Sequence, residues 1–376
     1  MTSRATWHVL PLGSIVELQR GFDLPTGKRS HGSVPVVGAS GVIGRHSEAA
    51  IKGPGVTLGR AGAMGVATYV ANDFWPLNTT LFVTDFRGND RKFIYYLLHH
   101  MDFSGYNSGG VQPMLNRNYI REIPVPIPVR SEQQAIAEVL GALDDKIAVN
   151  ERIAETSLAL AKARAEAVPP AESVRLGDIA EVFDGPHATP RKTREGPWFL
   201  SISSLKGGAF DLAESAHLAE EDFPRWTRRV QPSEGDVLFS YETRLGEAAL
   251  MPPGVRASLG RRMGLLRPKP GTVGRALLLH AYLSPSFQAE IRRRTVHGAT
   301  VDRIPLKEMP AWPITLPSDD IRPQLSTALE ALHTSINQVA VENRTLAALR
   351  DTLLPQLVTG KIRIKDAERV VEDATS

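Results

Sequence analysis

The feature that most restricts the fold of this chain is an internal duplication, because a repeat implies that one structural unit is built twice. Residues 12–17 read LGSIVE and residues 176–181 read LGDIAE. A second pair of matching stretches aligns Arg117 with Arg303 and Pro124 with Pro310. The two stretches lie further apart in the second copy, so we expect two related blocks, the second with insertions.

Each block shows the same internal order of patterns. Short runs rich in Val, Ile and Phe, separated by Gly and Pro, are typical of strands joined by tight turns. Such runs lie at 34–37, 56–58, 80–84, 237–240 and 263–266. A short helical pattern follows at 93–99 and at 276–283, and a proline-rich stretch then closes each block, since proline interrupts helices and central strands. The predicted fold class is α/β (α+β), with mixed short strands and helices in both blocks.

A long helical pattern follows each block. Residues 131–134 (SEQQ) form a capping-box pattern at the start of the first helix. Residues then recur at alternating spacings of four and three, as in the seam of a coiled coil. The predicted seam residues are Ile136, Leu140, Leu143, Ile147 and Asn150, then Leu325, Leu329, Leu332, Ile336 and Asn343. We expect two long helices that separate the blocks and pack against each other.

Each predicted seam includes one asparagine, Asn150 or Asn343. An Asn buried in a seam lowers stability but can fix the register and the choice of partner. The alternative is that each Asn lies at a helix end or at the edge of the contact.

These patterns divide the chain into five segments. They are a block at 1–130, a helix at 131–170, a second block at 171–317, a second helix at 318–360 and a tail at 361–376. Residues 366–376 are polar, and we expect them to fray.

Composition limits the classes of site that the chain can form. Of its 376 residues 42% are hydrophobic, and no apolar run approaches the ~18–20 residues of a membrane span. The absence of Cys excludes disulfides, thiolate nucleophiles and Cys-based zinc or iron–sulfur sites. The first residues lack the apolar core of a secretory signal, so we expect a soluble, cytoplasmic protein without a membrane partner.

The net charge of +3 conceals an alternation along the chain. Lys and Arg outnumber Asp and Glu in residues 1–130 and 183–310, whereas Asp and Glu predominate in 131–182 and 311–376. Basic blocks suit a polyanion, and acidic segments suit a protein partner or solvent. The pattern favours nucleic-acid binding by the two blocks.

The order of block, long helix, block and long helix resembles the specificity (S) subunit of type I restriction–modification systems. The stretches that carry the resemblance are 12–15 (LGSI), 120–126 (IREIPVP), 132–137 (EQQAIA), 143–147 (LDDKI) and 353–362 (LLPQLVTGKI). The resemblance implies two target-recognition domains that read the halves of a bipartite site in double-stranded DNA. It also implies an antiparallel coiled coil, pseudo-twofold symmetry and two methyltransferase (M) subunits as partners, joined by motor-nuclease (R) subunits for cleavage.

The resemblance assigns catalysis to those partners. An adenine methyltransferase needs an Asn/Asp-Pro-Pro-Tyr/Phe motif, which the Pro-Pro pairs at 169–170 and 252–253 lack, and the spaced glycines fit neither a dinucleotide fingerprint nor a P-loop. We expect no cofactor in this chain, with S-adenosylmethionine in the M subunit and ATP and Mg²⁺ in the R subunit. A metal nuclease at Asp73, Asp85 or Asp90 is a less favoured alternative, because such short acidic patterns arise often by chance.

Direct readout of DNA requires side chains at base edges, where Arg favours guanine and Asn or Gln favours adenine. Phosphate contacts require Arg, Lys or backbone N–H groups. The loops of the two blocks offer ten candidates, which are Arg20, Arg60, Gln112, Asn116, Arg117, Arg191, Arg244, Arg261, Arg262 and Arg303. The alternative for each of them is a solvated surface charge.

The predicted function is that of a non-catalytic DNA sequence-specificity subunit. The alternative is a coiled-coil interaction or scaffold protein without sequence-specific DNA readout.

Overall fold

The fold is that of a computed structural model, which describes residues 7–107, 114–298 and 301–375. The chain divides into two compact units. Unit 1 comprises Met1–Ala148 and Asn343–Ser376, and unit 2 comprises Val149–Glu342. Each of the two long helices contributes residues to both units.

Unit 1 is built on three small sheets. In sheet order the strands are β1 (His8–Pro11) and β9 (Pro124–Ile127); β2 (Glu17–Arg20), β8 (Thr80–Asp85), β5 (Gly55–Gly59) and β6 (Ala67–Val70); and β4 (Gly41–His46), β3 (Val34–Gly38) and β7 (Trp75–Pro76). The β3–β7 pair is parallel and the other pairs are antiparallel. The helical segments of this block are α1 (Leu12–Ile15), α2 (Arg91–His100), α3 (Arg117–Ile120) and the 3-10 turns Thr26–Lys28 and Ser104–Tyr106.

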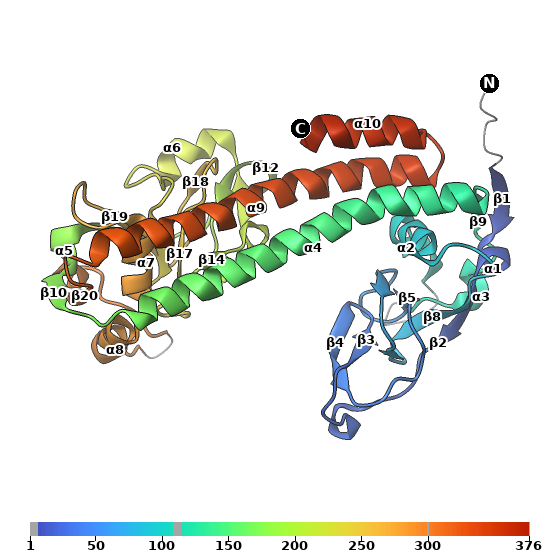
Figure 1. Cartoon of the computed structure of the whole chain (residues 1–376), viewed down its shortest axis with the longest axis horizontal. Helices are drawn as coiled ribbons and strands as arrows, with labels where there is room; N and C mark the ends of the chain where they lie inside the picture. Colours follow the sequence, from blue (N-terminus) through green and yellow to red (C-terminus); the bar gives the residue numbers. More distant parts are fainter. Residues whose placement is uncertain (1–6, 108–113, 299–300, 376) are drawn as a thin grey trace. The chain divides into compact units, whose positions relative to one another are not determined.

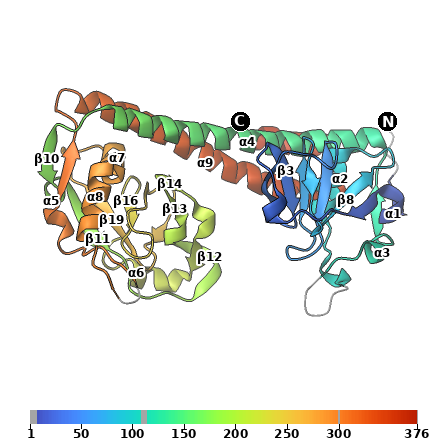
Figure 2. The ribbon, with the colours of Figure 1, turned by 90° about the horizontal axis from the view of Figure 1, so that it is seen from below.

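The helix α2 closes the core of unit 1. It begins where Asp90 caps it, the carboxylate accepting a bond from the Phe93 backbone N–H at 2.9 Å. Its apolar face buries Phe93 and Leu97 in one cluster with Val56 and Leu58 of β5. In the view of Figure 2, α2 lies between the strands and α4 (Arg130–Ala167).

Unit 2 repeats this plan with additions. In sheet order its strands are β10 (Glu172–Arg175) and β20 (Pro313–Leu316); β11 (Ala180–Asp184), β19 (Met263–Pro268), β16 (Val237–Ser240) and β17 (Ala248–Leu250); β15 (Ala216–Leu218), β12 (Lys192–Phe199) and β18 (Ala257–Ser258); and β13 (Leu205–Lys206) and β14 (Ala209–Phe210). Its helices are α5 (Leu176–Ile179), α6 (Phe223–Trp226), α7 (Arg275–Leu283) and α8 (Pro285–Arg294). The 3-10 turns are Ile202–Ser204, Leu212–Glu214, Glu220–Asp222 and Met309–Ala311.

The shared topology confirms the duplication and the fold class. The four-stranded order β11–β19–β16–β17 corresponds to β2–β8–β5–β6, and β15–β12–β18 corresponds to β4–β3–β7. The parallel pair recurs as well, since β12 runs parallel to β18 as β3 does to β7. Within the described ranges, the hairpin β13–β14 and the helices α6 and α8 are the additions of the second copy.

The structure corrects the alignment of the two proline-rich stretches. Pro11 pairs with Pro124 in unit 1, and the equivalent Arg175 pairs with Pro313 in unit 2. The counterpart of Pro124 is therefore Pro313 and not Pro310. Several prolines lie close together in each stretch, so a shifted alignment matches nearly as many of them. The strand pairing decides the register, since it is set by the buried face of the ladder.

The two long helices are confirmed as α4 and α9 (Arg322–Val358). They run antiparallel within unit 1. Asp144 of α4 pairs with Arg350 of α9, whereas the later residue Ile147 of α4 is bonded by the earlier residue Asn343 of α9. Of the predicted seam residues, six are buried, namely Ile136, Leu140, Leu143, Asn150, Leu325 and Leu329. The other four are half-buried, namely Ile147, Leu332, Ile336 and Asn343. None of the helices in the described part of the chain is long and apolar enough to cross a membrane.

Both asparagines lie in the interior of their helices and bond to the facing helix. Asn150 is fully buried, and its Nδ2 donates to Glu342 Oε2 at 2.8 Å. Asn343 donates its Nδ2 to the carbonyl oxygen of Ile147 at 3.3 Å. The positions are therefore those of polar seam residues, rather than those of a helix end.

The expectation of a frayed tail is wrong. Residues Ile364–Thr375 form the helix α10, which runs back along α9 in Figure 1. Ala367 is fully buried, and Ile364 and Val371 pack against the core of unit 1. These three positions are three and four residues apart and so share one face of a helix. Burial of this narrow apolar face stabilises a segment that is otherwise polar.

Candidate DNA-binding surface

Three loops converge in unit 1 at the ends of β2 and β5 and at the start of β8. The Gly21 N–H donates to the Thr80 carbonyl at 3.0 Å, and the Arg60 N–H donates to the Thr79 carbonyl at 2.8 Å. Glycine is required at position 21, since a Cβ there would overlap the carbonyl oxygen of Leu77. This close backbone contact brings the side chains of the three loops together.

The convergence forms a polar cluster, here called cluster A, of Arg20, Asp23, Arg60 and Asn78. Arg20 Nη2 lies 3.5 Å from Asp23 Oδ1, and Asn78 Nδ2 donates to the same oxygen. Arg60 Nη1 lies 3.5 Å from the carbonyl oxygen of Asn78. The candidates Arg20 and Arg60 therefore belong to one cluster. Sequence reasoning missed Asp23 and Asn78, although Asp23 lies only three residues after Arg20.

The equivalent loops of unit 2 converge through the same backbone bonds. The Gly185 N–H donates to the Met263 carbonyl at 2.8 Å, and the Tyr241 N–H donates to the Arg262 carbonyl at 3.1 Å. Gly185 and Tyr241 are therefore the counterparts of Gly21 and Arg60. The two units present loops of common origin at the same place in the fold.

The side chains at this place in unit 2, here called cluster B, are Asp184, His187, Arg229, Tyr241 and Arg261. Asp184 Oδ2 accepts from Arg229 Nη1 at 2.6 Å and lies 3.2 Å from His187 Nε2. The Tyr241 hydroxyl lies 3.4 Å from His187 Nδ1. Burial, followed by the nearby Glu242 and Asp184 carboxylates, raises the pKa of Tyr241 to about 12. Tyr241 therefore stays protonated and can act as a donor.

A cationic cleft of about 570 Å³ adjoins cluster B. The arginines that line it are Arg191, Arg225, Arg228 and Arg229, and Trp226 forms part of its wall. Arg191 is a predicted candidate, whereas the other three arginines were missed. Residues 225–229 (RWTRR) combine basic and aromatic side chains, and this signal was available in the sequence. The cleft has the charge that suits a phosphate group.

Arg262 is held in a strained backbone conformation next to cluster B. Its φ is 71°, and that of Thr243 is 68°, in the left-handed region that favours glycine. Arg262 Nη1 donates to Thr243 Oγ1 at 3.0 Å, and Arg262 Nε lies 3.2 Å from Glu242 Oε2. The backbone of Arg303 forms an isolated β-bridge with the backbone of Glu242, and Arg303 is exposed. The candidates Arg261, Arg262 and Arg303 thus adjoin one another through Tyr241 and Glu242.

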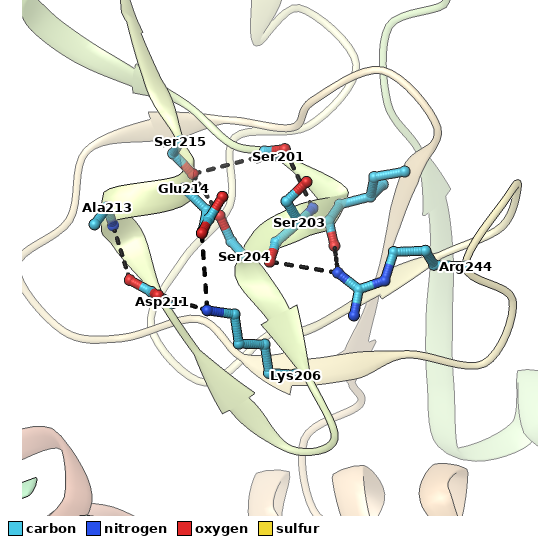
Figure 3. Close-up of polar contacts among 10 residues, drawn as sticks. Ser201, Ser203, Ser204, Lys206, Asp211, Ala213, Glu214, Ser215 and Arg244 are labelled. Atoms are coloured by element: carbon cyan, nitrogen blue, oxygen red, sulfur yellow. Dashed lines mark hydrogen bonds and ion pairs between the residues drawn. The ribbon is translucent and has the colours of Figure 1, made fainter. Parts of the chain in front are cut away.

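Arg244 lies in a different polar network. Figure 3 shows its guanidinium group directed at the 3-10 turn Ile202–Ser204. The Nη1 atom donates to the carbonyl of Ile202 at 3.2 Å, and Nη2 lies 3.6 Å from Glu247. Lys206 lies in the same segment and pairs with Asp211 at 2.8 Å. Arg244 therefore fastens the inserted segment of unit 2 to the turn that follows β16.

Asn116 and Arg117 also serve local structure. Asn116 caps α3 by accepting from the Asn118 N–H at 3.0 Å, and Arg117 Nη1 donates to the Leu18 carbonyl at 3.2 Å. Arg117 lines a cleft of about 210 Å³ together with Arg87 and Arg121, and no member of cluster A lines that cleft. Gln112 lies outside the described residues.

The expected equivalence of Arg117 and Arg303 is wrong. The Leu115 N–H donates to the Arg60 carbonyl, and the Ile304 N–H donates to the Tyr241 carbonyl. Leu115 and Ile304 are therefore counterparts, so Arg303 corresponds to Met114. The shifted alignment of the proline-rich stretches explains the error.

The three carboxylates considered for a metal nuclease have structural roles. Asp73 accepts from the Gly53 N–H at 2.9 Å, Asp85 accepts from the Arg87 N–H at 2.7 Å, and Asp90 caps α2. Among the residues that the structure describes, no three His, Asp or Glu side chains gather into a group that could hold a metal ion.

Comparisons with known proteins agree with this architecture. Residues 4–156 match the family model of the type I restriction modification DNA specificity domain. A curated relative from Haemophilus influenzae, a putative type I restriction enzyme specificity subunit, is 22% identical over 267 residues, which are 66% of this chain and 68% of the relative. Residues 4–156 are therefore identified as a type I restriction modification DNA specificity domain, and the longer stretch is similar to a specificity subunit.

The likeness in fold extends beyond the matched domain. The crystal structure of a type I restriction–modification S subunit from M. genitalium superposes with a TM-score of 0.65 at 17% identity, covering 95% of this chain and 97% of the other. The family model matches only the first copy and most of α4, whereas this structural likeness includes both copies and both long helices.

Proposed function

We propose that this specificity subunit reads a bipartite target in double-stranded DNA, one half with each unit. The observation that carries the proposal is that clusters A and B lie on equivalent loops of two duplicated units. Each cluster combines cationic groups with side chains that can bond to base edges. Two copies of one reading surface, with different side chains, suit a target with two different halves.

The cationic cleft supports a role for unit 2 in holding the DNA backbone. Within the described residues, Arg225 and Arg228 form no ion pair. Each is exposed at the cleft, so their charges are available to an external anion. Neutralisation of phosphates by such side chains releases counterions and is the main source of non-specific affinity for DNA.

The long helices support a role in assembling two methyltransferase subunits, with restriction subunits joining for cleavage. Val149, Ile153 and Leu160 of α4 are exposed to 52%, 38% and 43%. Their spacings of four and seven place them on one helix face. A row of exposed apolar side chains suits a protein partner.

The proposal assigns no catalytic step and no cofactor to this chain. The methyltransferase partner would bind S-adenosylmethionine, and the restriction subunit would bind ATP and Mg²⁺. The absence of a methyltransferase tetrapeptide from the sequence supports this division of roles.

The test is to co-express the chain with the methyltransferase encoded beside it and to map methylated bases by single-molecule sequencing. We expect a split motif, methylated on both strands across a fixed unread gap. A soluble, assembled complex that methylates no defined motif would contradict the proposal and would favour a scaffold without DNA readout.

A further inference from the structure

We propose that Asn78 and Arg261 are equivalent base-reading residues that give the two half-sites different sequences. Asn78 of unit 1 would read an adenine, and Arg261 of unit 2 would read a guanine. This inference rests on the proposed function, because it assumes that clusters A and B face DNA.

The equivalence of the two residues follows from the backbone. In unit 1 the Thr80 N–H donates to the Leu77 carbonyl at 2.9 Å, which closes a turn with Asn78 as its second residue. In unit 2 the Met263 N–H donates to the Gly260 carbonyl at 3.2 Å, which closes a turn with Arg261 as its second residue. Each turn leads into the equivalent strand, β8 or β19.

Both turns are held by the same neighbours. The backbone carbonyl of the third residue of each turn accepts a hydrogen bond from the loop after the equivalent strand. In unit 1 the Arg60 N–H donates to Thr79, and in unit 2 the Tyr241 N–H donates to Arg262. The fourth residue accepts from Gly21 in unit 1 and from Gly185 in unit 2. The second position therefore occupies the same place in the fold of both units. The two turns differ in the conformation of their third residue, since the φ of Arg262 is positive and that of Thr79 is not.

Asn78 is oriented for adenine by its neighbour Asp23. Its Nδ2 donates to Asp23 Oδ1, which determines which end of the amide is the nitrogen. One N–H and the carbonyl Oδ1 of the amide then remain for a ligand. Adenine offers the complementary pair, an N7 acceptor and an N6 donor. Arg20 Nη2 lies 3.5 Å from the same carboxylate oxygen, so Asp23 also has a cationic neighbour in cluster A.

Of the two arginines in this turn, Arg261 is the one whose guanidinium group is available to a ligand. Its side chain is exposed and, in the described part of the chain, forms no hydrogen bond or ion pair. The adjacent Arg262 is instead engaged with Glu242 and Thr243. A free guanidinium fork matches the O6 and N7 acceptors of guanine with two parallel bonds.

The experiment selects bound duplexes from a randomised library with the chain in complex with its methyltransferase partner. We compare the wild type with Asn78→Ala, Asn78→Gln, Arg261→Ala and Arg261→Lys. For Asn78→Ala we expect loss of preference at one A·T pair in one half-site, by roughly 5- to 150-fold. For Arg261→Ala we expect a similar loss at one G·C pair in the other half-site, with the remaining positions unchanged.

The conservative variants and a matched control separate readout from structure. Asn78→Gln keeps the amide and should retain part of the adenine preference, and Arg261→Lys should retain part of the guanine preference. Arg292→Ala removes an exposed arginine of α8 and should leave the selected motif unchanged. Thermal unfolding and co-purification with the partner establish that each variant folds and assembles.

Two results would overturn the inference while the proposed function stands. One is a wild-type split motif that Asn78→Ala and Arg261→Ala leave unchanged. The other is equal weakening on all sequences, which identifies phosphate contacts. If the wild-type complex selects no motif at all, the proposed function itself fails.

Discussion

The imidazole ring of His280 in α7 lies against that of His333 in α9, with their Nε2 atoms 3.0 Å apart and both side chains buried. One ring donates and the other accepts, so in the neutral pair the two rings hold complementary tautomers. Burial, and then the neighbouring His333, lowers the pKa of His280 to about 4, and burial also lowers the pKa of His333. The pair joins the second block to the long helix that follows it.

The histidine pair predicts that unit 2 loses stability in mild acid. A pKa below the unfolded value of ~6.5 means that the unfolded chain binds the proton more readily. The contribution of the neutral pair to the free energy of unfolding is therefore fully present above pH ~6.5 and is lost as the pH falls toward 4. For His280 this loss is on the order of 3 kcal/mol. The protection factors of the α7 amides, which are hydrogen-exchange rates corrected for intrinsic exchange, measure this loss between pH 7 and 4.5.

A double variant, His280→Leu with His333→Leu, provides the control for that prediction. It replaces two titrating groups by apolar ones of similar size, so the protection factors of the α7 amides, which are corrected for intrinsic exchange, should depend less on pH than in the wild type. An unchanged pH dependence would assign the effect to other groups.

The contacts of Asp144 predict that its loss lowers the free energy of unfolding much more than loss of its neighbour Asp145 in α4. Asp144 accepts from the Tyr96 hydroxyl at 2.6 Å and from Arg350 Nη1 at 2.9 Å, so it links α2, α4 and α9 in unit 1. Asp144→Ala leaves both donors without this acceptor and should destabilise unit 1 by about 2 kcal/mol. Asp145 is exposed and lies 3.4 Å from Lys92, so Asp145→Ala should cost less than about 0.5 kcal/mol. Denaturant unfolding of the two variants measures both losses. Equal losses in the free energy of unfolding would contradict the role assigned to Asp144.

The cationic cleft predicts a change in the salt dependence of DNA binding. Arg225→Ala with Arg228→Ala removes two charges from the cleft and should weaken binding to all sequences alike. The slope of log K against log salt should decrease by up to ~2. Binding titrations of the assembled complex at several salt concentrations measure the slope. A changed base preference at an unchanged slope would instead make these arginines base-reading residues.

The exposed apolar row on α4 predicts where the methyltransferase contacts unit 2. Val149→Ser, Ile153→Ser and Leu160→Ser together should weaken co-purification with the methyltransferase at least about tenfold, with stability changed by no more than about 1 kcal/mol. The control is Glu151→Ser with Glu155→Ser, which alters exposed side chains two positions further along, on another face. Equal retention of the partner by both variants would exclude the row as a contact surface.

The sequence by itself determined the features whose signals are local and repeated. The duplication, the strands and the long helices each depend on spacings within a few residues or on direct similarity between the copies. The seam residues were predictable for the same reason, since alternating spacings of four and three describe one helix face. Arg20 and Arg60 could be selected as candidates because each lies next to a glycine in a predicted loop, and their role in DNA binding stays a prediction.

Only the tertiary structure decided which residues meet. Asn78 joins Asp23, and Tyr241 joins His187, through contacts between loops that lie far apart in the sequence. No local pattern encodes such contacts, because they arise when several strands pack into one sheet. The counterpart of Pro124 was decided by strand pairing, and the helical state of α10 by burial of a single apolar face against the core of unit 1. In each case the deciding free energy comes from packing between distant segments, which composition and spacing do not contain.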